Sequence, residues 1–330
     1  MNNKVISLFS GCGGLDLGFT KAGFDVIWAN EFDKTIWQTY EKNHPKTTLD
    51  KRDIRQIKSE DIPDCIGIIG GPPCQSWSEA GKQRGLNDDR GQVFLEYIRL
   101  LKDKQPRFFL AENVSGILHK KHQVALENIL AGFEEAGYIV SYKLLDTKYY
   151  GVPQERKRVI FIGFHVDLNK KFCFDKLKPA SNILTLRQAI GDLCGCELPA
   201  IGRSKANGEM CHKPNHEYMQ GDFSSIYMSR NRVRSWNEAS FTIQASGRHC
   251  PIHPQANRMI HVGKDLWIFD PDSLLPYRRL SVRECARIQT FPDEFIFYYQ
   301  DLAVGYKMIG NAVPVNFAQE IAKCIKTEIR

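Results

Sequence analysis

In the first half of the chain, short runs of β-branched and other apolar residues alternate with longer stretches whose apolar residues recur every three or four positions. This alternation is typical of strand–helix–strand units that build a mostly parallel sheet with helices on both faces. The short runs predict strands over residues 4–9, 25–31, 48–53, 66–70, 107–113, 138–145 and 159–164. The longer stretches predict helices over residues 15–22, 34–43, 92–102 and 123–136. We therefore predict an open α/β domain.

The regular alternation stops at about residue 191. Residues 191–279 are rich in Gly, Asn, Ser, His and Pro and hold only short alternating pieces such as 241–244, which is typical of loops. Later patterns predict helices over 282–289 and 315–327, the second of them behind the turn GNAVP at 310–314. We expect a first domain of residues 1–190 and 304–330, a loop-rich second domain of residues 191–285, and a hinge at 286–303.

Composition narrows the class of protein. The chain has 330 residues, of which 42% are hydrophobic and 25% charged, so it can bury one large core or two modest ones and is not fibrous or disordered. No apolar run approaches the ~18 residues of a membrane span, and the first one is too short for a signal peptide. We expect a soluble protein that stays where it is made.

Cysteine usage and charge add two further constraints. The ten cysteines are irregularly spaced and lie mostly in apolar segments, which indicates reduced thiols in a cytosolic protein rather than a disulfide framework. Lys and Arg total 45 and Asp and Glu total 38, so the net charge is +7. This charge permits a polyanionic partner but does not require one.

The segment SLFSGCGGLDLGF, residues 7–19, predicts a strand, a glycine turn and a helix. Such a turn lets a cofactor approach backbone N–H groups at the helix N-terminus. Asp16 occupies the third position of a strict G-x-G-x-x-G pattern, and no Gly-Lys-Ser/Thr follows, so neither a strict dinucleotide pattern nor a P-loop is present. Taken alone, the glycines are also compatible with a purely structural turn.

Two carboxylates follow the next strands. Glu31 ends the second predicted strand, 20 residues after Gly11, where an acidic side chain can bind both hydroxyls of a ribose. Asp53 ends the third predicted strand in the same manner. Together with the glycine turn, these carboxylates favour an adenosine-containing ligand over a bare phosphate.

GGPPCQSWS, residues 70–78, places Cys74 at the carboxyl end of a hydrophobic strand, where ligands bind in open α/β sheets. An isolated cysteine is usually a small core residue. This one follows Pro-Pro and precedes a polar stretch and the Gly-, Arg- and Asp-rich residues 81–91, which are typical of a mobile lid. We therefore interpret Cys74 as a reactive thiolate.

Two more motifs bring charge to the same sheet edge. The fifth predicted strand ends in Glu112-Asn113-Val114, although a strand-end glutamate is often only solvated. In QERKR, residues 154–158, Gln154, Arg156 and Arg158 are spaced two apart and point the same way on an extended backbone. Two guanidinium groups beside a thiolate could hold a carbonyl oxygen or a phosphate, and an ordinary basic loop is the alternative.

In their order along the chain, these motifs resemble those of the DNA (cytosine-5) methyltransferase family. The resemblance also includes RRLSVRECARIQTFP at 278–292 and GYKMIGNAVPV at 305–315, and it spans nearly the whole chain. It implies a Rossmann-like, S-adenosylmethionine-dependent methyltransferase sheet with a smaller, loop-rich target-recognition domain. It also implies that the C-terminal helix belongs to the first domain.

The resemblance implies covalent catalysis, because cytosine C5 is a poor nucleophile. The Cys74 thiolate would add to C6 of a cytosine that has swung out of the duplex. Glu112 would contact N3 and the exocyclic amine, and Arg158 would hold O2, with Arg156 in the same catalytic group. A base that the sequence does not identify would remove the C5 proton before Cys74 leaves.

The resemblance further assigns the cofactor and DNA contacts. For S-adenosylmethionine, Phe9 would pack on adenine, Glu31 would bind ribose and Asp53 the adenine amino group. The rest of that pocket would be formed by Gly11, Gly13, Ile54, Pro73 and Asn311. Ser78 and Arg90 would contact the target nucleotide or its backbone when the lid closes.

Residues 228–256 resemble the target-recognition region of HaeIII-type methyltransferases, which modify the internal cytosine of GGCC. Arg230, Arg232 and Arg234 alternate along SRNRVR, and Arg248 follows a flexible Ser-Gly. Arginine forks pair bidentately with guanine O6 and N7 in the major groove, although arginines also neutralise phosphates without reading bases. We expect base reading by Arg230, Arg232 and Arg248, and a DNA-backbone contact by Arg234.

Three other interpretations stay open. A dehydrogenase would share the glycine turn and ribose carboxylate but would not explain the Pro-Pro-Cys, ENV and QERKR set. A non-catalytic relative would lack the nucleophile, whereas Cys74 and Glu112 are present. A zinc site could use Cys194, Cys196 and Cys211 with His212 or His216, but Cys-x-Cys lacks the usual spacing, so we expect no metal.

The partners follow from the implied activity. We expect double-stranded DNA as substrate, a monomer that acts on one strand at a time, and a bacterial cytoplasmic protein associated with the nucleoid. Short single-chain enzymes of this kind are typical of restriction–modification systems, in which a cognate endonuclease cuts the same site without contacting the methyltransferase.

Overall fold

The computed structural model describes residues 3–73 and 89–329, which fall into two compact units. Unit 1 consists of residues 1–146, 157–178 and 317–330, and unit 2 of residues 147–156 and 179–316. None of the helices in the described ranges has the length and apolar content of a membrane span.

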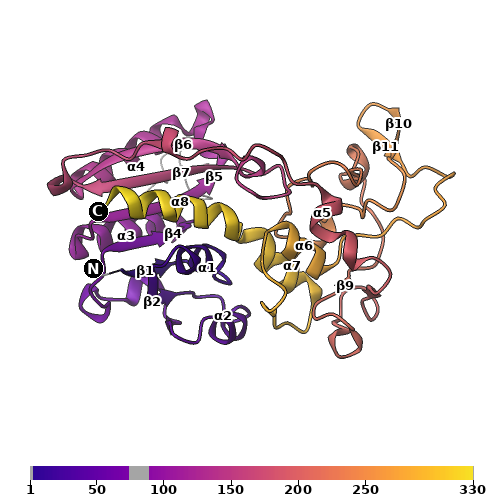
Figure 1. Cartoon of the computed structure of the whole chain (residues 1–330), viewed down its shortest axis with the longest axis horizontal. Helices are drawn as coiled ribbons and strands as arrows, with labels where there is room; N and C mark the ends of the chain where they lie inside the picture. The colour runs from indigo at the N-terminus through magenta and orange to yellow at the C-terminus, as the bar shows by residue number, and fades with distance from the viewer. Residues whose placement is uncertain (1–2, 74–88, 330) are drawn as a thin grey trace. The chain divides into compact units, whose positions relative to one another are not determined.

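Unit 1 is built around a sheet that, within the described residues, has seven strands in the order β3-β2-β1-β4-β5-β7-β6 (Figure 1). The first five pair in parallel, and β7 pairs antiparallel with both β5 and β6. In chain order, the strands are β1 (Lys4–Leu8), β2 (Asp25–Asn30), β3 (Thr48–Asp50), β4 (Gly67–Gly70), β5 (Phe108–Val114), β6 (Tyr138–Asp146) and β7 (Lys157–His165). The mixed α/β fold is therefore the one that the sequence predicts.

Helices cover both faces of this sheet, because adjacent residues of a strand point to opposite sides. Phe109 of β5 packs against Phe133, with ring centroids 4.3 Å apart, whereas Phe108 stacks at 6.4 Å with Phe19. Lys326 donates to the backbone oxygens of Ala22 and Gly23 on the Phe108 face. The helices are α1 (Gly14–Lys21), α2 (Trp37–Asn43), α3 (Asp89–Lys104), α4 (Gln123–Glu135) and α8 (Val315–Glu328).

The third predicted strand is shorter than expected. It ends at Asp50, and residues 54–56 form a turn of 3₁₀ helix instead. The Asp53 side chain caps this turn by accepting a hydrogen bond from the Arg55 N–H at 3.0 Å. An aspartate at this position satisfies an otherwise unpaired donor, so the chain leaves the sheet earlier than the apolar pattern suggests.

Unit 2 is mostly loops around three short helices in its described residues: α5 (Leu186–Ile190), α6 (Val282–Ile288) and α7 (Leu302–Asn311). Small strand pairs join β8 (Leu198–Pro199) to β9 (Glu217–Tyr218) and β10 (Ile260–Gly263) to β11 (Leu266–Ile268). The sequence pattern misses α5 and α7.

The unit boundaries differ from the predicted domain boundaries. Residues 147–156 and 286–316 all lie in unit 2, including the predicted hinge and the predicted return to the first domain at residue 304. The reason is packing within unit 2: Tyr306 of α7 donates to the Leu280 carbonyl at 2.7 Å, and a Cβ on Gly310 would lie 2.3 Å from the Gln244 backbone. The last part of the chain, from residue 317, lies in unit 1.

A buried charge network holds α6 in place. Arg278 donates to both oxygens of Glu284 at 2.8 Å and to Glu197 at 3.0 Å. His253 lies 3.4 Å from Glu284, and neither side chain is exposed. Burial works against ionisation of Glu284, but the hydrogen bonds and charge of Arg278 prevail and lower its pKa to about 2. Burial lowers the pKa of His253 to about 4.

These two shifts make the stability of the protein sensitive to acid in one direction. His253 stays neutral in the folded state, whereas the unfolded chain binds a proton below about pH 6.5, so its contribution is lost as the pH falls from 6.5 towards 4. The contribution of Glu284 is complete above pH 4.5 and is lost towards pH 2. We expect the free energy of unfolding in urea to fall between pH 7 and 4.5, and the H253N variant to show a shallower fall. Equal slopes in the two proteins would contradict this assignment.

Candidate functional site

The glycine turn between β1 and α1 is shaped by close contacts. Gly13 precedes α1 with φ +87°, and a Cβ on it would lie 2.0 Å from Nε2 of His44. Gly11 also has a positive φ, +56°. The left-handed backbone and the contact with the His44 ring both require glycine at position 13. The turn therefore packs closely against the His44 ring at the N-terminus of α1.

Glu31 follows β2 and is linked directly to this turn. One carboxylate oxygen accepts from the Gly11 N–H at 2.8 Å, and the other accepts from the Asp33 N–H at 2.7 Å. The side chain is partly exposed, and each carboxylate oxygen can accept more than one hydrogen bond. A carboxylate with two acceptor oxygens suits the two vicinal hydroxyls of a ribose, which are hydrogen-bond donors.

The other predicted cofactor residues lie around the same strand ends of unit 1. Ile54 is buried, and Phe9 is partly buried, packs against the core and has a φ of +54°. Asp53 forms an ion pair with Arg55 at 2.5 Å, and the hydrogen bond from that guanidinium lowers the pKa of Asp53. Its carboxylate thus stays ionised and able to accept hydrogen bonds, but Arg55 already occupies part of it.

A buried carboxylate lies beneath the glycine turn, and the sequence motifs give no role to it. Asp16, in the first turn of α1, accepts hydrogen bonds from the Ser7 hydroxyl and the Tyr40 hydroxyl, both at 2.6 Å. Burial raises the pKa of Asp16 to about 6, although both hydrogen bonds lower it. The contact joins β1, α1 and α2. The sequence offered one signal for this contact, because Asp16 is a charged residue among the apolar residues of the predicted helix 15–22.

The carboxyl ends of β4 and β5 form the second part of this edge. Nε of Arg158 lies 2.7 Å from Oε1 of Glu112, and both side chains are largely buried. Cys74 and Ser78 lie outside the described residues, and Pro73 is the exposed last residue before them. A Cβ on Gly71 would lie 3.3 Å from Oε2 of Glu112. The chain thus reaches Cys74 from the immediate neighbourhood of the Glu112–Arg158 pair.

Asn113 fixes the backbone on this approach. Its buried amide donates to the Pro72 carbonyl at 3.2 Å, and its carbonyl accepts from the Val114 N–H at 2.8 Å. The ENV segment therefore supplies both a carboxylate and an anchor for the segment that leads to Cys74.

The structure separates the three alternating residues of QERKR. Gln154 and Arg156 belong to unit 2 and are buried, whereas Arg158 belongs to β7 in unit 1. The guanidinium of Arg156, 1% exposed, donates to the carbonyl oxygens of Ile243, Gly310 and Ala312 at 3.1, 2.9 and 3.1 Å. These bonds favour a structural role for Arg156 over the predicted catalytic one, because its donors are directed to the backbone.

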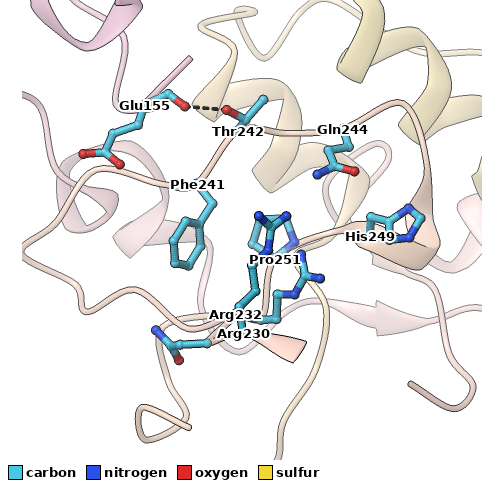
Figure 2. A pocket seen from close by; sticks show the side chains of 9 residues that line it. Glu155, Arg230, Arg232, Phe241, Thr242, Gln244, His249 and Pro251 are labelled. Carbon is cyan, nitrogen blue, oxygen red and sulfur yellow. Dashed lines mark hydrogen bonds between the residues drawn. The ribbon is translucent and has the colours of Figure 1, made fainter. Parts of the chain in front are cut away.

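Unit 2 contains a hollow of about 340 Å³. Figure 2 shows its side chains, with Phe241 on one side and His249 at the other end. The residues that line it, which we call the recognition hollow, are Glu155, Arg230, Asn231, Arg232, Phe241, Thr242, Gln244, His249 and Pro251. Sequence reasoning selected only the two arginines among them.

The four arginines predicted to contact DNA differ in their surroundings. Arg230 and Arg248 are exposed, and among the described residues neither has a hydrogen-bond or ion-pair partner. Arg232 lines the recognition hollow, but it is 5% exposed and donates to the carbonyl oxygens of Tyr227 and Ile226 at 2.8 and 3.1 Å. Burial, followed by repulsion from Arg230, lowers the pKa of Arg232.

Arg234 has acidic partners on both sides. Its guanidinium pairs with Glu155 at 2.6 Å and with Glu238 at 2.9 Å, and it lies 4.2 Å from the centre of the Phe241 ring. These contacts favour a role in shaping the recognition hollow over the predicted DNA-backbone contact, because a phosphate would have to displace a carboxylate.

Two further predicted site residues, Arg90 and Asn311, lie in helices. Arg90 lies in α3, although its side chain is outside the described part, and Asn311 is the exposed last residue of α7 in unit 2. No group of three or more His, Cys, Asp or Glu residues in residues 3–73 and 89–329 is arranged to hold a metal ion. This includes the cysteines and histidines considered for a zinc site.

The Asn113 contact generates a stability prediction. Asn113→Asp keeps the shape of the side chain but replaces the donating amide by an oxygen that faces the Pro72 carbonyl. We expect the free energy of unfolding to fall by about 1–3 kcal/mol, the cost of a buried hydrogen bond left unmade. Urea denaturation of this variant should be compared with Asn128→Asp at an exposed position of α4. An equal loss in both variants would contradict the anchoring role.

Comparison with known proteins gives a consistent result over the whole chain. Residues 3–327 match the family model of C-5 cytosine-specific DNA methylase. The chain is 57% identical to Type II methyltransferase M.MthTI of Methanothermobacter thermautotrophicus, over 100% of this chain and 98% of that protein. It is also 57% identical to Type II methyltransferase M.FnuDI of Fusobacterium nucleatum, over 98% and 94% of the two chains.

A solved structure shows the same architecture. A prophage-encoded protein of E. coli, described as a DNA modification methyltransferase, superposes with a TM-score of 0.75 at 25% identity, over 98% of each chain. The match extends through both units of the fold.

Proposed function

The chain belongs to the C-5 cytosine-specific DNA methylase family and is a DNA (cytosine-5) methyltransferase, and we propose that it modifies the internal cytosine of GGCC with Cys74 as nucleophile. The observation that supports the catalytic assignment is the Glu112–Arg158 pair beside the segment that leads to Cys74. The chain's arginine-lined recognition hollow supports a target made of G·C pairs.

Cys74 would act as a covalent catalyst that is regenerated in each cycle. Its thiolate adds to C6 of the extruded cytosine, which makes C5 electron-rich, and C5 then forms the new bond to the methyl group. S-adenosylmethionine would supply this methyl group from its sulfonium: the S–CH3 bond breaks, its electron pair stays on sulfur, and S-adenosylhomocysteine leaves as a neutral thioether. A base takes the proton from C5, and the electron pair of that C–H bond restores the double bond as the thiolate departs from C6. The enzyme thus ends the cycle with a free Cys74.

Glu112 and Arg158 stabilise the base during addition. Glu112 would bind N3 and the exocyclic amine of cytosine, and Arg158 would hold O2. Their ion pair places a carboxylate and a guanidinium side by side, which matches the donor and acceptor atoms along one edge of the base. In this proposal Arg156 supports the fold of unit 2 and does not touch the substrate.

The S-adenosylmethionine site would lie at the strand ends of unit 1. Glu31 would accept from the ribose hydroxyls, Asp53 from the adenine amino group, and Phe9 and Ile54 would contact the adenine ring. Gly11 and Gly13 would form the turn beside the ligand, and a Cβ on Gly11 would meet no atom within 4 Å. We retain Pro73, Ser78, Arg90 and Asn311 in the proposal on the resemblance alone.

Arg230 and Arg232 of the recognition hollow, together with exposed Arg248, would read guanines through O6 and N7. Arg230 and Arg232 repel one another, and the electron-rich edges of neighbouring guanines would relieve that repulsion. We further propose that the protein acts as a monomer on double-stranded DNA in the bacterial cytoplasm, within a restriction–modification system whose endonuclease cuts the same site.

The nucleophile is tested by Cys74→Ser. A hydroxyl fills the same space but is far less nucleophilic at neutral pH, so we expect methyl transfer to fall below a few per cent of the wild-type rate, with DNA and cofactor binding kept. Duplexes with 5-fluorocytosine at the target should trap the wild-type enzyme covalently and should not trap the variant. Cys173→Ser, at an exposed position of unit 1, is the control. A normal rate for Cys74→Ser would refute the assignment.

Base reading is tested by a pair of arginine variants. Arg230→Ala should lose about 1–3 kcal/mol of discrimination at one base pair, measured as methylation rates on GGCC duplexes with single changes. Arg234→Ala should slow methylation of all these duplexes alike and leave the dependence of binding on salt unchanged, because its charge is already paired. Uniform loss in Arg230→Ala would show that it contacts phosphate only.

A further inference from the structure

A guanidinium can read the guanine of a G·C pair but not its cytosine. In the major groove guanine presents acceptors, N7 and O6, whereas cytosine presents a donor, the N4 amino group. A guanidinium has five donors and no acceptor. The recognition hollow therefore needs an acceptor if it reads cytosine as well as guanine, an inference that rests on the proposed function of this hollow.

Most acceptors in the recognition hollow are already committed. Oδ1 of Asn231 accepts from the N–H groups of Val233 and Met259, both at 3.2 Å. The carboxylate of Glu155 pairs with Arg234 through one oxygen and with Lys148, at 3.0 Å, through the other. Figure 2 shows this carboxylate directed away from Arg230 and Arg232.

Gln244 differs from these groups. It is half-buried, it lines the recognition hollow, and its side-chain amide has no hydrogen-bond partner among the described residues. In Figure 2 the amide end points from the Phe241–Gln244 segment towards the side of the hollow that holds Arg230 and Arg232. The amide of Gln244 is thus available to a ligand in the recognition hollow.

The backbone that carries Gln244 is held rigidly. The Ile243 N–H donates to Oε1 of buried Gln154 at 2.8 Å, and the Ile243 carbonyl accepts from Arg156 at 3.1 Å. Behind Gln244, the backbone of Gly310 lies so close that a Cβ there would be 2.3 Å from the Gln244 carbonyl carbon. A side chain carried on such a fixed segment can hold one geometry for recognition.

We propose that Gln244 is a specificity-determining residue that reads cytosine: its Oε1 accepts from the N4 amino group of a stacked cytosine of the target. Its Nε2 then donates to O6 of a neighbouring guanine, so that one amide reads a C·G step while the arginines read guanines. A thymine at the same position presents an acceptor, O4, to Oε1 and is disfavoured.

The test removes the hydrogen bond between Gln244 and the cytosine N4 amino group in two ways, by changing the DNA and by changing the protein. Hemimethylated GGCC duplexes carry 2-pyrimidinone, which lacks the N4 amino group, at one stacked cytosine at a time. For the wild type, we expect kcat/KM to fall by about five- to tenfold at the cytosine that Gln244 reads, the loss of about one hydrogen bond. In Gln244→Ala and in the shape-preserving Gln244→Met, the same substitution in the DNA should cause no further loss.

The control is Gln255→Ala, because Gln255 lies outside the recognition hollow and donates to the Pro276 carbonyl. It should keep the full wild-type response to 2-pyrimidinone. A different outcome would overturn the proposal: the Gln244 variants lose activity on normal DNA and still show the full loss of kcat/KM when 2-pyrimidinone replaces any stacked cytosine. Gln244 would then not read cytosine. If the wild type methylates another sequence, the GGCC target alone is wrong, and the same series is built in that sequence.

Discussion

The buried guanidinium of Arg156 joins three segments of unit 2 that are distant in the sequence. It donates to the backbone oxygens of Ile243, Gly310 and Ala312, and it has almost no exposed surface. The Ala312 carbonyl also accepts from Gln289 at 3.2 Å. A buried carbonyl that loses its hydrogen bond costs about 1–3 kcal/mol. One side chain from the QERKR motif therefore helps to position both the backbone at Ile243 and the end of α7.

The same motif continues directly into β7 of unit 1. Residue 157 begins β7, and Arg158 pairs with Glu112 on the neighbouring strand. Gln154, two residues before Arg156, holds the Ile243 N–H and also bonds to Gln289 at 2.9 Å. Five consecutive residues thus supply two anchors of the backbone at Ile243 and one half of the ion pair that we propose to be catalytic.

Much of unit 1 could be predicted from periodicity, because its strands are buried runs and its helices have one apolar face. The placement of β7 between β5 and β6 could not, since strand order depends on packing and not on local pattern. Alternation along QERKR suggested one shared direction for Gln154, Arg156 and Arg158, but partners from distant segments give them different roles. Local pattern likewise gave no signal for the partners of Arg234.

We propose that the protein methylates C5 of a cytosine in a G·C-only site. The recognition hollow would read the site, and Glu112 and Arg158 would hold the cytosine. Bisulfite sequencing of DNA from cells that express the protein reports activity, modified base and sequence context together. We expect full protection of the internal cytosine at GGCC sites, and unprotected cytosines elsewhere. Cytosine protection confined to sites that contain A·T pairs would contradict the proposed recognition, and an absence of protected cytosines would contradict the catalytic assignment.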